Sequence, residues 1–140
     1  MSKIAVVYWS GTGNTEAMAN AVVDGAKQKG AEVDLVKCSD FTVNDVEQYD
    51  AIAFGCPSMG AEQLEENEFE PMFTSVEDNL AGKKVGLFGS WGWGNGAWML
   101  DWEERTRSKG ADLVPSVTCM EAPDAEAIQA CEALGETLAS

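Results

Sequence analysis

Residues 3–15 read KIAVVYWSGTGNT, a mostly apolar run that leads directly into a glycine-rich turn. The run Lys3–Trp9 does not alternate with polar residues, which is typical of a parallel strand buried on both faces. From Glu16 to Lys29 the apolar residues recur at helical spacing, and Gly30 supplies a stop. This stretch therefore predicts a central strand, a tight turn and a helix, in that order.

The rest of the chain repeats this alternation of strands and helices. Strand patterns cover residues 32–37, 51–56, 85–89 and 113–119, and helical patterns cover 69–80, 97–109 and 124–139. The weakest segment, 39–48, is expected to be a loop with a short helical turn. Such alternation predicts a parallel sheet with helices on both faces, and five strands fit the doubly wound order 2-1-3-4-5. We therefore expect residues 1–140 to form a single three-layer α/β domain.

The turn after the first strand has the composition of a phosphate-binding loop. It consists of Ser10, Gly11, Thr12, Gly13, Asn14 and Thr15. Its glycines let backbone N–H groups turn inward, its hydroxyls and amide can donate, and the helix N-terminus adds positive potential. Glu16 stands where a dinucleotide fingerprint needs a third glycine, and the lysine of a Walker loop is missing. The loop suits a permanently bound monophosphate, with an ordinary polar turn as the alternative.

Two further loops follow strands beside the switch point of the sheet, where ligands of this architecture bind. One contains Pro57, Ser58, Met59, Gly60, Ala61 and Glu62, and the other contains Ser90, Trp91, Gly92, Trp93, Gly94, Asn95 and Gly96. Trp93 lies between two glycines, and stacking on a flat aromatic ligand would account for it better than core filling. Trp98 and Trp102 stand at helical spacing and are expected in the core. The loop at 120–123 follows the last strand.

Composition limits the classes of function that this chain can have. Twenty-four acidic against nine basic residues give a net charge of −15, which makes nucleic acid and anionic membranes poor partners. The absence of histidine excludes Ser-His-Asp and Cys-His catalysis and histidine metal sites. No apolar run approaches the about 18 residues of a membrane span, and no signal-peptide pattern precedes the first strand, so we expect a cytoplasmic protein. The cysteines form no Cys-x-x-Cys pair, which predicts no metal site and four reduced thiols, at Cys38, Cys56, Cys119 and Cys131.

The acidic residues are unevenly distributed along the chain. Between Cys38 and Gly82 there is no lysine or arginine. This acidic segment holds eleven acids: Asp40, Asp45, Glu47, Asp50, Glu62, Glu65, Glu66, Glu68, Glu70, Glu77 and Asp78. It is either a solvated surface that keeps the protein soluble or a docking face for basic partners, and one surface can serve both purposes.

The three loops together resemble those of the short-chain flavodoxins of anaerobic bacteria. The resemblance rests on Ser10-x-Thr12-Gly13-Asn14-Thr15-Glu16, Gly55-Cys56-Pro57-x-Met59-Gly60-x-Glu62 and Gly89-Ser90-Trp91-Gly92-Trp93-Gly94. It extends over essentially the whole chain and implies a flavodoxin-like fold with FMN bound tightly but without a covalent bond. It assigns the FMN phosphate to Ser10–Thr15 and the hydroxyl of Ser90. It places the flavin between Met59 and Trp93, Gly60 beside flavin N5, and Glu62 as acceptor from N3–H.

The resemblance also implies what the protein does. It implies a low-potential one-electron carrier, cycling mainly between the semiquinone and hydroquinone of FMN, and therefore an electron-transfer protein and not an enzyme. Because the hydroquinone anion would form beside a phosphate and Glu62 in a chain of charge −15, its formation is disfavoured. The expected partners are ferredoxin-linked oxidoreductases and reductases that dock on the acidic face of a monomer.

Two other classes of function stay open at this point. An FMN-dependent NAD(P)H:quinone-type reductase on the same fold would need a nicotinamide pocket, for which the chain has little sequence to spare. A non-redox module could use the loop for another phosphate. Steady NAD(P)H oxidation would favour the first, and a protein that stays colourless after FMN addition would favour the second.

Overall fold

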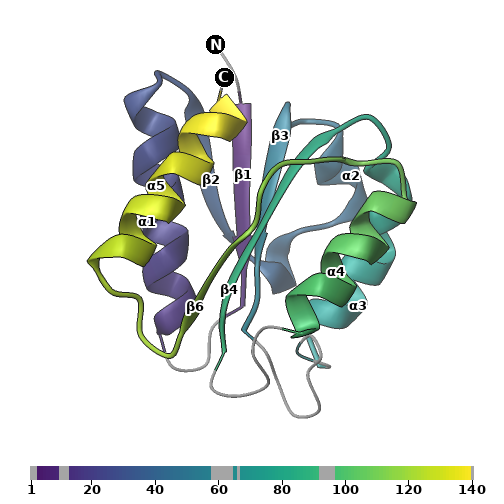
Figure 1. The fold of residues 1–140 in the computed structure, drawn as a ribbon. Coiled ribbons are helices and arrows are strands. Elements are labelled where there is room, and N and C mark those ends of the chain that lie inside the picture. The colour runs from purple at the N-terminus through teal and green to yellow at the C-terminus, as the bar shows by residue number, and fades with distance from the viewer. Residues whose placement is uncertain (1–2, 10–12, 58–64, 66, 92–96, 140) are drawn as a thin grey trace.

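The computed structural model describes residues 3–9, 13–57, 65, 67–91 and 97–139 (Figure 1). The strands are β1 (Lys3–Tyr8), β2 (Glu32–Lys37), β3 (Ala51–Gly55), β4 (Lys84–Trp91), β5 (Asp112–Leu113) and β6 (Val117–Met120). The helices are α1 (Asn14–Gln28), α2 (Val43–Val46), α3 (Phe69–Val76), α4 (Ala97–Ser108) and α5 (Ala125–Ala139), with 3-10 turns at Cys38–Asp40 and Glu77–Asn79. Figure 1 shows the sheet from its edge, with α1 and α5 on one face and α2, α3 and α4 on the other.

The strands pair in parallel in the order β2-β1-β3-β4-β5, which confirms the predicted topology, and β6 is an additional strand that pairs with β4. The prediction of one strand over 113–119 was wrong, because β5 ends at Leu113 and β6 begins at Val117. Pro115 lies in the gap, and a proline cannot donate a ladder hydrogen bond. Strand β4 is longer than predicted because it pairs with both short strands.

Helices α1 and α3 differ from their predicted bounds, since α3 ends at Val76 and not at residue 80, whereas the short helical turn expected within 39–48 is present. Helix α1 begins at Asn14 and not at Glu16, since Gly13, with φ of 93°, lies in the left-handed region and forms its N-cap. In the segment 39–48 the helical turn is α2. The backbone N–H and the hydroxyl of Thr42 both contact the Asp45 carboxylate, at 2.9 and 3.1 Å, which completes a capping box at the start of α2.

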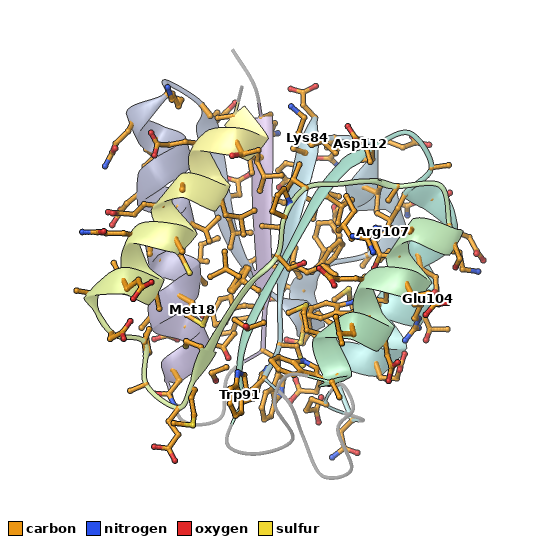
Figure 2. All side chains as sticks on the ribbon, in the orientation of Figure 1. Met18, Lys84, Trp91, Glu104, Arg107 and Asp112 are labelled. Carbon is orange, nitrogen blue, oxygen red and sulfur yellow. The ribbon has the colours of Figure 1, made fainter. Side chains whose placement is uncertain are left out.

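The sheet separates two hydrophobic cores, because β1, β3 and β4 are buried on both faces. The core beneath α3 and α4 is rich in aromatic rings and contains Trp98 and Trp102, as predicted. There the ring of Phe73 packs edge-on against Phe54 at 5.2 Å and against Trp102 at 5.8 Å between centroids. The core beneath α1 and α5 is made mostly of aliphatic and small side chains, among them Met18 of α1 (Figure 2).

Helices α1 and α5 touch backbone to backbone. A Cβ atom added at Gly25 of α1 would meet the carbonyl oxygen of Glu132, and one added at Gly135 of α5 would meet the carbonyl oxygen of Val22. The two glycines therefore occupy a close crossing at which neither helix has room for a side chain.

An ion-pair network joins α3 to α4. The Arg105 guanidinium donates to the carboxylates of Glu70 and Glu77, with Nη2–O distances of 2.8 Å to each, and lies 5.0 Å from the centre of the Phe73 ring. The hydrogen bond to Glu77 and the one to Glu70 raise the pKa of Arg105, although burial opposes them. Lys109 pairs with Asp78 at 2.7 Å. The acidic segment thus lacks bases only in the sequence, because Arg105 of α4 and Lys109, the residue after α4, lie against it in space.

Helix length and composition bear on membrane insertion as well. Within the described ranges, no helix combines the length and the apolar composition that crossing a bilayer requires.

All four cysteines are free thiols, three of them buried, as expected.

Candidate cofactor site at the carboxyl ends of the strands

Hydrogen bonds beyond the strand ends hold the starts of the predicted loops in one row. Trp9 N donates to Gly55 O at 3.0 Å, Cys56 N donates to Phe88 O at 3.1 Å, and Glu121 N donates to Trp91 O at 2.8 Å. These bonds continue the parallel ladder past β1, β3 and β6. Loops that leave β1, β3, β4 and β6 therefore start side by side at the edge where this architecture binds its ligands.

The structure describes six of the predicted site residues at this edge: Gly13, Asn14, Thr15, Pro57, Ser90 and Trp91. The other ten lie outside the described residues: Ser10, Gly11, Thr12, Ser58, Met59, Gly60, Ala61, Glu62, Gly92 and Trp93.

The start of α1 carries a polar group that lacks a partner. Thr15 is 1% exposed, and its hydroxyl makes no hydrogen bond within the part of the chain that the structure describes. The N-cap residue of this helix is Gly13, which supplies no side-chain acceptor to the first N–H groups of α1. A buried hydroxyl without a partner costs free energy, about 1–3 kcal/mol, which a bound acceptor would recover. The unpartnered hydroxyl of Thr15 and the N-terminus of α1 together suit a phosphate group such as that of FMN.

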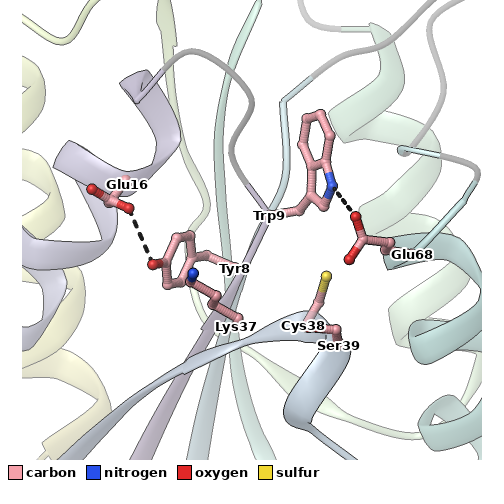
Figure 3. A pocket seen from close by; sticks show the side chains of 7 residues that line it. All are labelled: Tyr8, Trp9, Glu16, Lys37, Cys38, Ser39 and Glu68. Atoms are coloured by element: carbon pink, nitrogen blue, oxygen red, sulfur yellow. Dashed lines mark hydrogen bonds between the residues drawn. The ribbon is translucent and has the colours of Figure 1, made fainter.

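A cavity of about 330 Å³ adjoins this point, at the ends of β1 and β2 (Figure 3). Its lining residues are Tyr8, Trp9, Glu16, Lys37, Cys38, Ser39 and Glu68. The Tyr8 hydroxyl donates to Glu16 Oε2 at 3.2 Å, and Trp9 Nε1 donates to Glu68 Oε1 at 3.3 Å. Each aromatic side chain therefore orients a carboxylate, one on either side of the cavity, and Lys37 is the one base among the lining residues that the structure describes.

Two groups in the cavity stay protonated near neutral pH. Burial, followed by the hydrogen bond to Glu16, raises the pKa of Tyr8. Burial and then the charges of Glu68 and Glu65 raise the pKa of the Cys38 thiol to about 11. Cys38 is consequently not a reactive thiolate, which agrees with its expected role as a small apolar group.

Glu65 fixes the start of α3 next to the site, a role that the sequence analysis missed. Its buried carboxylate accepts hydrogen bonds from the backbone N–H groups of Asn67, Glu68 and Phe69, at 2.9, 2.7 and 2.9 Å. Its own N–H lies 3.4 Å from the Cys56 sulfur at the end of β3. The only sequence signal was an acidic residue just before an apolar helix, where acids are favoured.

Strands β3 and β4 each have a glycine near their carboxyl ends, Gly55 and Gly89, at which the packing leaves no room for a side chain. A Cβ at Gly89 would meet the Cys56 carbonyl oxygen, and one at Gly55 would meet the Phe88 ring. Ser90 follows with 5% exposure, and Trp91 ends the strand half-buried. The two glycines therefore fix the spacing of the strands from which the second and third loops start.

Glu121, just after β6, adopts a left-handed conformation with φ of 55°. This conformation costs about 1–2 kcal/mol for a residue with a Cβ, whereas asparagine tolerates it. We expect Glu121→Asn to raise the free energy of unfolding by about 0.5–1 kcal/mol in urea denaturation. Glu121→Gln removes the same charge but keeps the strain, so it should change stability less; equal gains would attribute the effect to charge.

Comparison with known proteins supports a single family. The model of the family described as flavodoxin matches residues 6–135. The chain is 48% identical to a flavodoxin of Megasphaera elsdenii over 136 residues, covering 97% of this chain and 98% of the relative. It is 42% identical to a flavodoxin of Clostridium beijerinckii over 135 residues, covering 96% and 98%. The solution structure of two-electron reduced Megasphaera elsdenii flavodoxin superimposes with a TM-score of 0.90 at 49% identity, covering 97% of this chain and 98% of that one.

Proposed function

This chain belongs to the flavodoxin family, whose members carry electrons on bound FMN, and we propose that it holds the FMN at the carboxyl ends of β1, β3 and β4. It is an electron-transfer protein that acts with redox partner proteins, and not an enzyme. The quinone-type reductase considered above is not favoured, because relatives matched over nearly their whole length are flavodoxins. We further propose that residues 1–140 form one FMN-binding domain that works in the cytoplasm, where its four free thiols would stay reduced.

The phosphate of FMN is assigned to the loop at the start of α1. Its proposed ligands are Ser10, Gly11, Thr12, Gly13, Asn14 and Thr15, with the hydroxyl of Ser90 in addition. The observation that carries this assignment is the buried hydroxyl of Thr15, which has no partner among the described residues. A phosphate oxygen in front of α1 would accept from it and benefit from the helix dipole.

The ring end of the site is assigned to the two other loops. Its proposed residues are Pro57, Ser58, Met59, Gly60, Ala61 and Glu62, and Ser90, Trp91, Gly92 and Trp93. Bound FMN supplies the one-electron chemistry, and the chain contributes binding, orientation and potential. Glu16 and Glu68, oriented by Tyr8 and Trp9, add negative potential near the site, which disfavours a further negative charge on the bound flavin.

Partner docking is proposed for the exposed acids of the acidic segment at this edge. Four of the eleven acids are less available to a partner. Glu65 and Glu77 are buried. Glu70 pairs with Arg105 of α4, and Asp78 pairs with Lys109, the residue after α4. Asp40, in the turn after β2, and Glu68, at the cavity, remain exposed. We propose that ferredoxin-linked oxidoreductases and reductases dock there through basic surfaces.

Thr15→Val tests the phosphate assignment, because it should weaken FMN binding without lowering the stability of the apoprotein. Valine keeps the shape but removes the buried hydroxyl, so the apoprotein should be unchanged in stability or more stable. The FMN complex should weaken by about 1.5–3 kcal/mol, because a hydrogen bond to a charged phosphate oxygen is lost. Titrating the apoprotein with FMN and with riboflavin measures this, and riboflavin affinity should stay nearly constant.

Thr15→Ser is the matched control, since it keeps the hydroxyl and should keep most of the FMN affinity. If Thr15→Val weakened riboflavin as much as FMN, Thr15 would not contact the phosphate. If it lowered the stability of the apoprotein and left both affinities intact, the hydroxyl would be a structural group with a partner inside the protein.

A further inference from the structure

Strand β6 leaves one edge of the sheet open. Within the described residues β6 pairs only with β4, and Glu121 N, just past its end, donates to Trp91 O. Backbone groups of alternate residues in a strand point to opposite edges, so those of Thr118 and Met120 point away from β4. Both residues are exposed, and such an edge offers N–H and C=O groups to another extended chain.

A groove runs along this edge between β6 and α5, which lie side by side at the front of Figure 1. It consists of two hollows of about 380 and 260 Å³ that share Ala130. Ala122 and Ala127 line the first hollow and Ala133 the second. Side chains this small leave space for alternate side chains of an added strand.

The charge around the groove indicates which kind of peptide segment could bind there. After Lys109 the sequence contains six acids and no lysine or arginine, and Asp124 and Glu126 line the groove. A second copy of this chain would bring the same acids against them, in a protein of charge −15. Charge complementarity therefore favours an extended segment rich in lysine or arginine.

We propose that the groove between β6 and α5 binds an extended basic segment of a redox partner, which adds a strand to the sheet at Thr118 and Met120. Met120 pairs with Trp91 at the proposed flavin end of the molecule, so this segment anchors the partner beside the cofactor. The Met120 side chain, 60% exposed, supplies an apolar contact at that end. The identity of the partner as a redox protein rests on the proposed function, whereas the strand-binding groove does not.

The test uses the FMN-loaded protein and an eight-residue peptide that alternates lysine with valine and threonine. Amide shifts in NMR spectra should change along β6 and the first half of α5, and the same peptide with glutamate for lysine should not bind. Thr118→Pro removes one outward N–H without breaking the ladder to β4, and should weaken binding about tenfold. Thr118→Val keeps the N–H and should stay within about twofold of the wild type.

Two further measurements test the proposal even if Thr118→Pro does not fold. A peptide N-methylated at alternate residues should bind the unchanged protein about tenfold more weakly. Glu126→Gln should weaken binding more than Glu32→Gln, which removes an exposed acid from the opposite edge strand β2.

Two outcomes would overturn the proposal. The first is equal affinity for the methylated and unmethylated peptides. The second is a dimer in sedimentation experiments that Thr118→Pro abolishes, which would make this edge an interface between copies. FMN absorbance, followed in every sample, keeps these outcomes separate from a failure of the flavin assignment.

Discussion

Glu65→Ala is expected to lower the free energy of unfolding of the apoprotein by about 3–5 kcal/mol. The Glu65 side chain is 5% exposed, and its carboxylate is the acceptor for three backbone N–H groups at the start of α3. Alanine would leave these donors without their acceptor, and the one of Phe69 is buried. Urea denaturation followed by circular dichroism measures the change, with Glu47→Ala, at an exposed acid of the same segment, as the control.

The effect of Glu65 should depend on pH in a defined direction. Burial raises the pKa of its carboxyl, but the hydrogen bonds from Phe69, Glu68 and Asn67 together outweigh burial and hold the pKa below its usual value. A pKa lowered by folding stabilises the protein above the unfolded-state value, and this contribution is lost as the pH falls through the folded-state value. The stability difference between the wild type and Glu65→Gln should therefore be largest near neutral pH and shrink as the pH falls below the unfolded-state value of about 4.3. A difference that grew on acidification would contradict an ionised acceptor at this position.

Gly135→Ala is expected to destabilise the protein by about 3 kcal/mol, against the trend for helices. Replacing a glycine inside a helix by alanine normally gains about 1 kcal/mol. Here the new Cβ meets the Val22 carbonyl oxygen of α1, which cannot move without displacing the whole helix. Thermal and urea denaturation of Gly135→Ala and Gly25→Ala measure the loss, and a gain in stability would show that the crossing is looser than described.

The double variant adds a test of the shared crossing. Once one alanine has forced α1 and α5 apart, the second should cost less than it does alone. The Gly25→Ala, Gly135→Ala pair should thus lose less stability than the sum of the two single variants, whereas full additivity would mean two independent contacts.

The sequence predicted those parts of the fold that depend on local pattern. The apolar run of β1, the glycine turn and the strand–helix alternation lead to the observed strand order, because buried parallel strands have few other arrangements. The split between β5 and β6 was readable in principle, since Pro115 interrupts the expected strand. The left-handed Gly13, which starts α1 early, was not distinguishable from any other loop glycine.

Contacts between distant segments account for what the sequence did not predict. Arg105 reaches Glu77 across 28 positions and Glu70 across 35, so the acidic segment looked free of bases. Glu65 was missed for a different reason: its contacts with Asn67, Glu68 and Phe69 are local, but nothing in the sequence distinguishes this acid from the exposed acids around it. The cavity lined by Tyr8 and Glu68 likewise depends on distant segments, because Trp9, just after β1, donates to Glu68 across 59 positions.

The unequal composition of the two cores gives each side of the sheet its own spectroscopic signal. Trp9, Trp91, Trp98 and Trp102 all belong to or pack against the core on the α3–α4 side, whereas the other core contains none of the described tryptophans. Intrinsic fluorescence of the apoprotein therefore reports mainly on that half of the molecule. Far-ultraviolet dichroism is weighted towards α1 and α5, which at 15 residues each are the longest helices described. In the Gly135→Ala variant, α1 and α5 should detach from the sheet before the aromatic core unfolds. The denaturation midpoint measured by dichroism should then lie at a lower urea concentration than the midpoint measured by fluorescence.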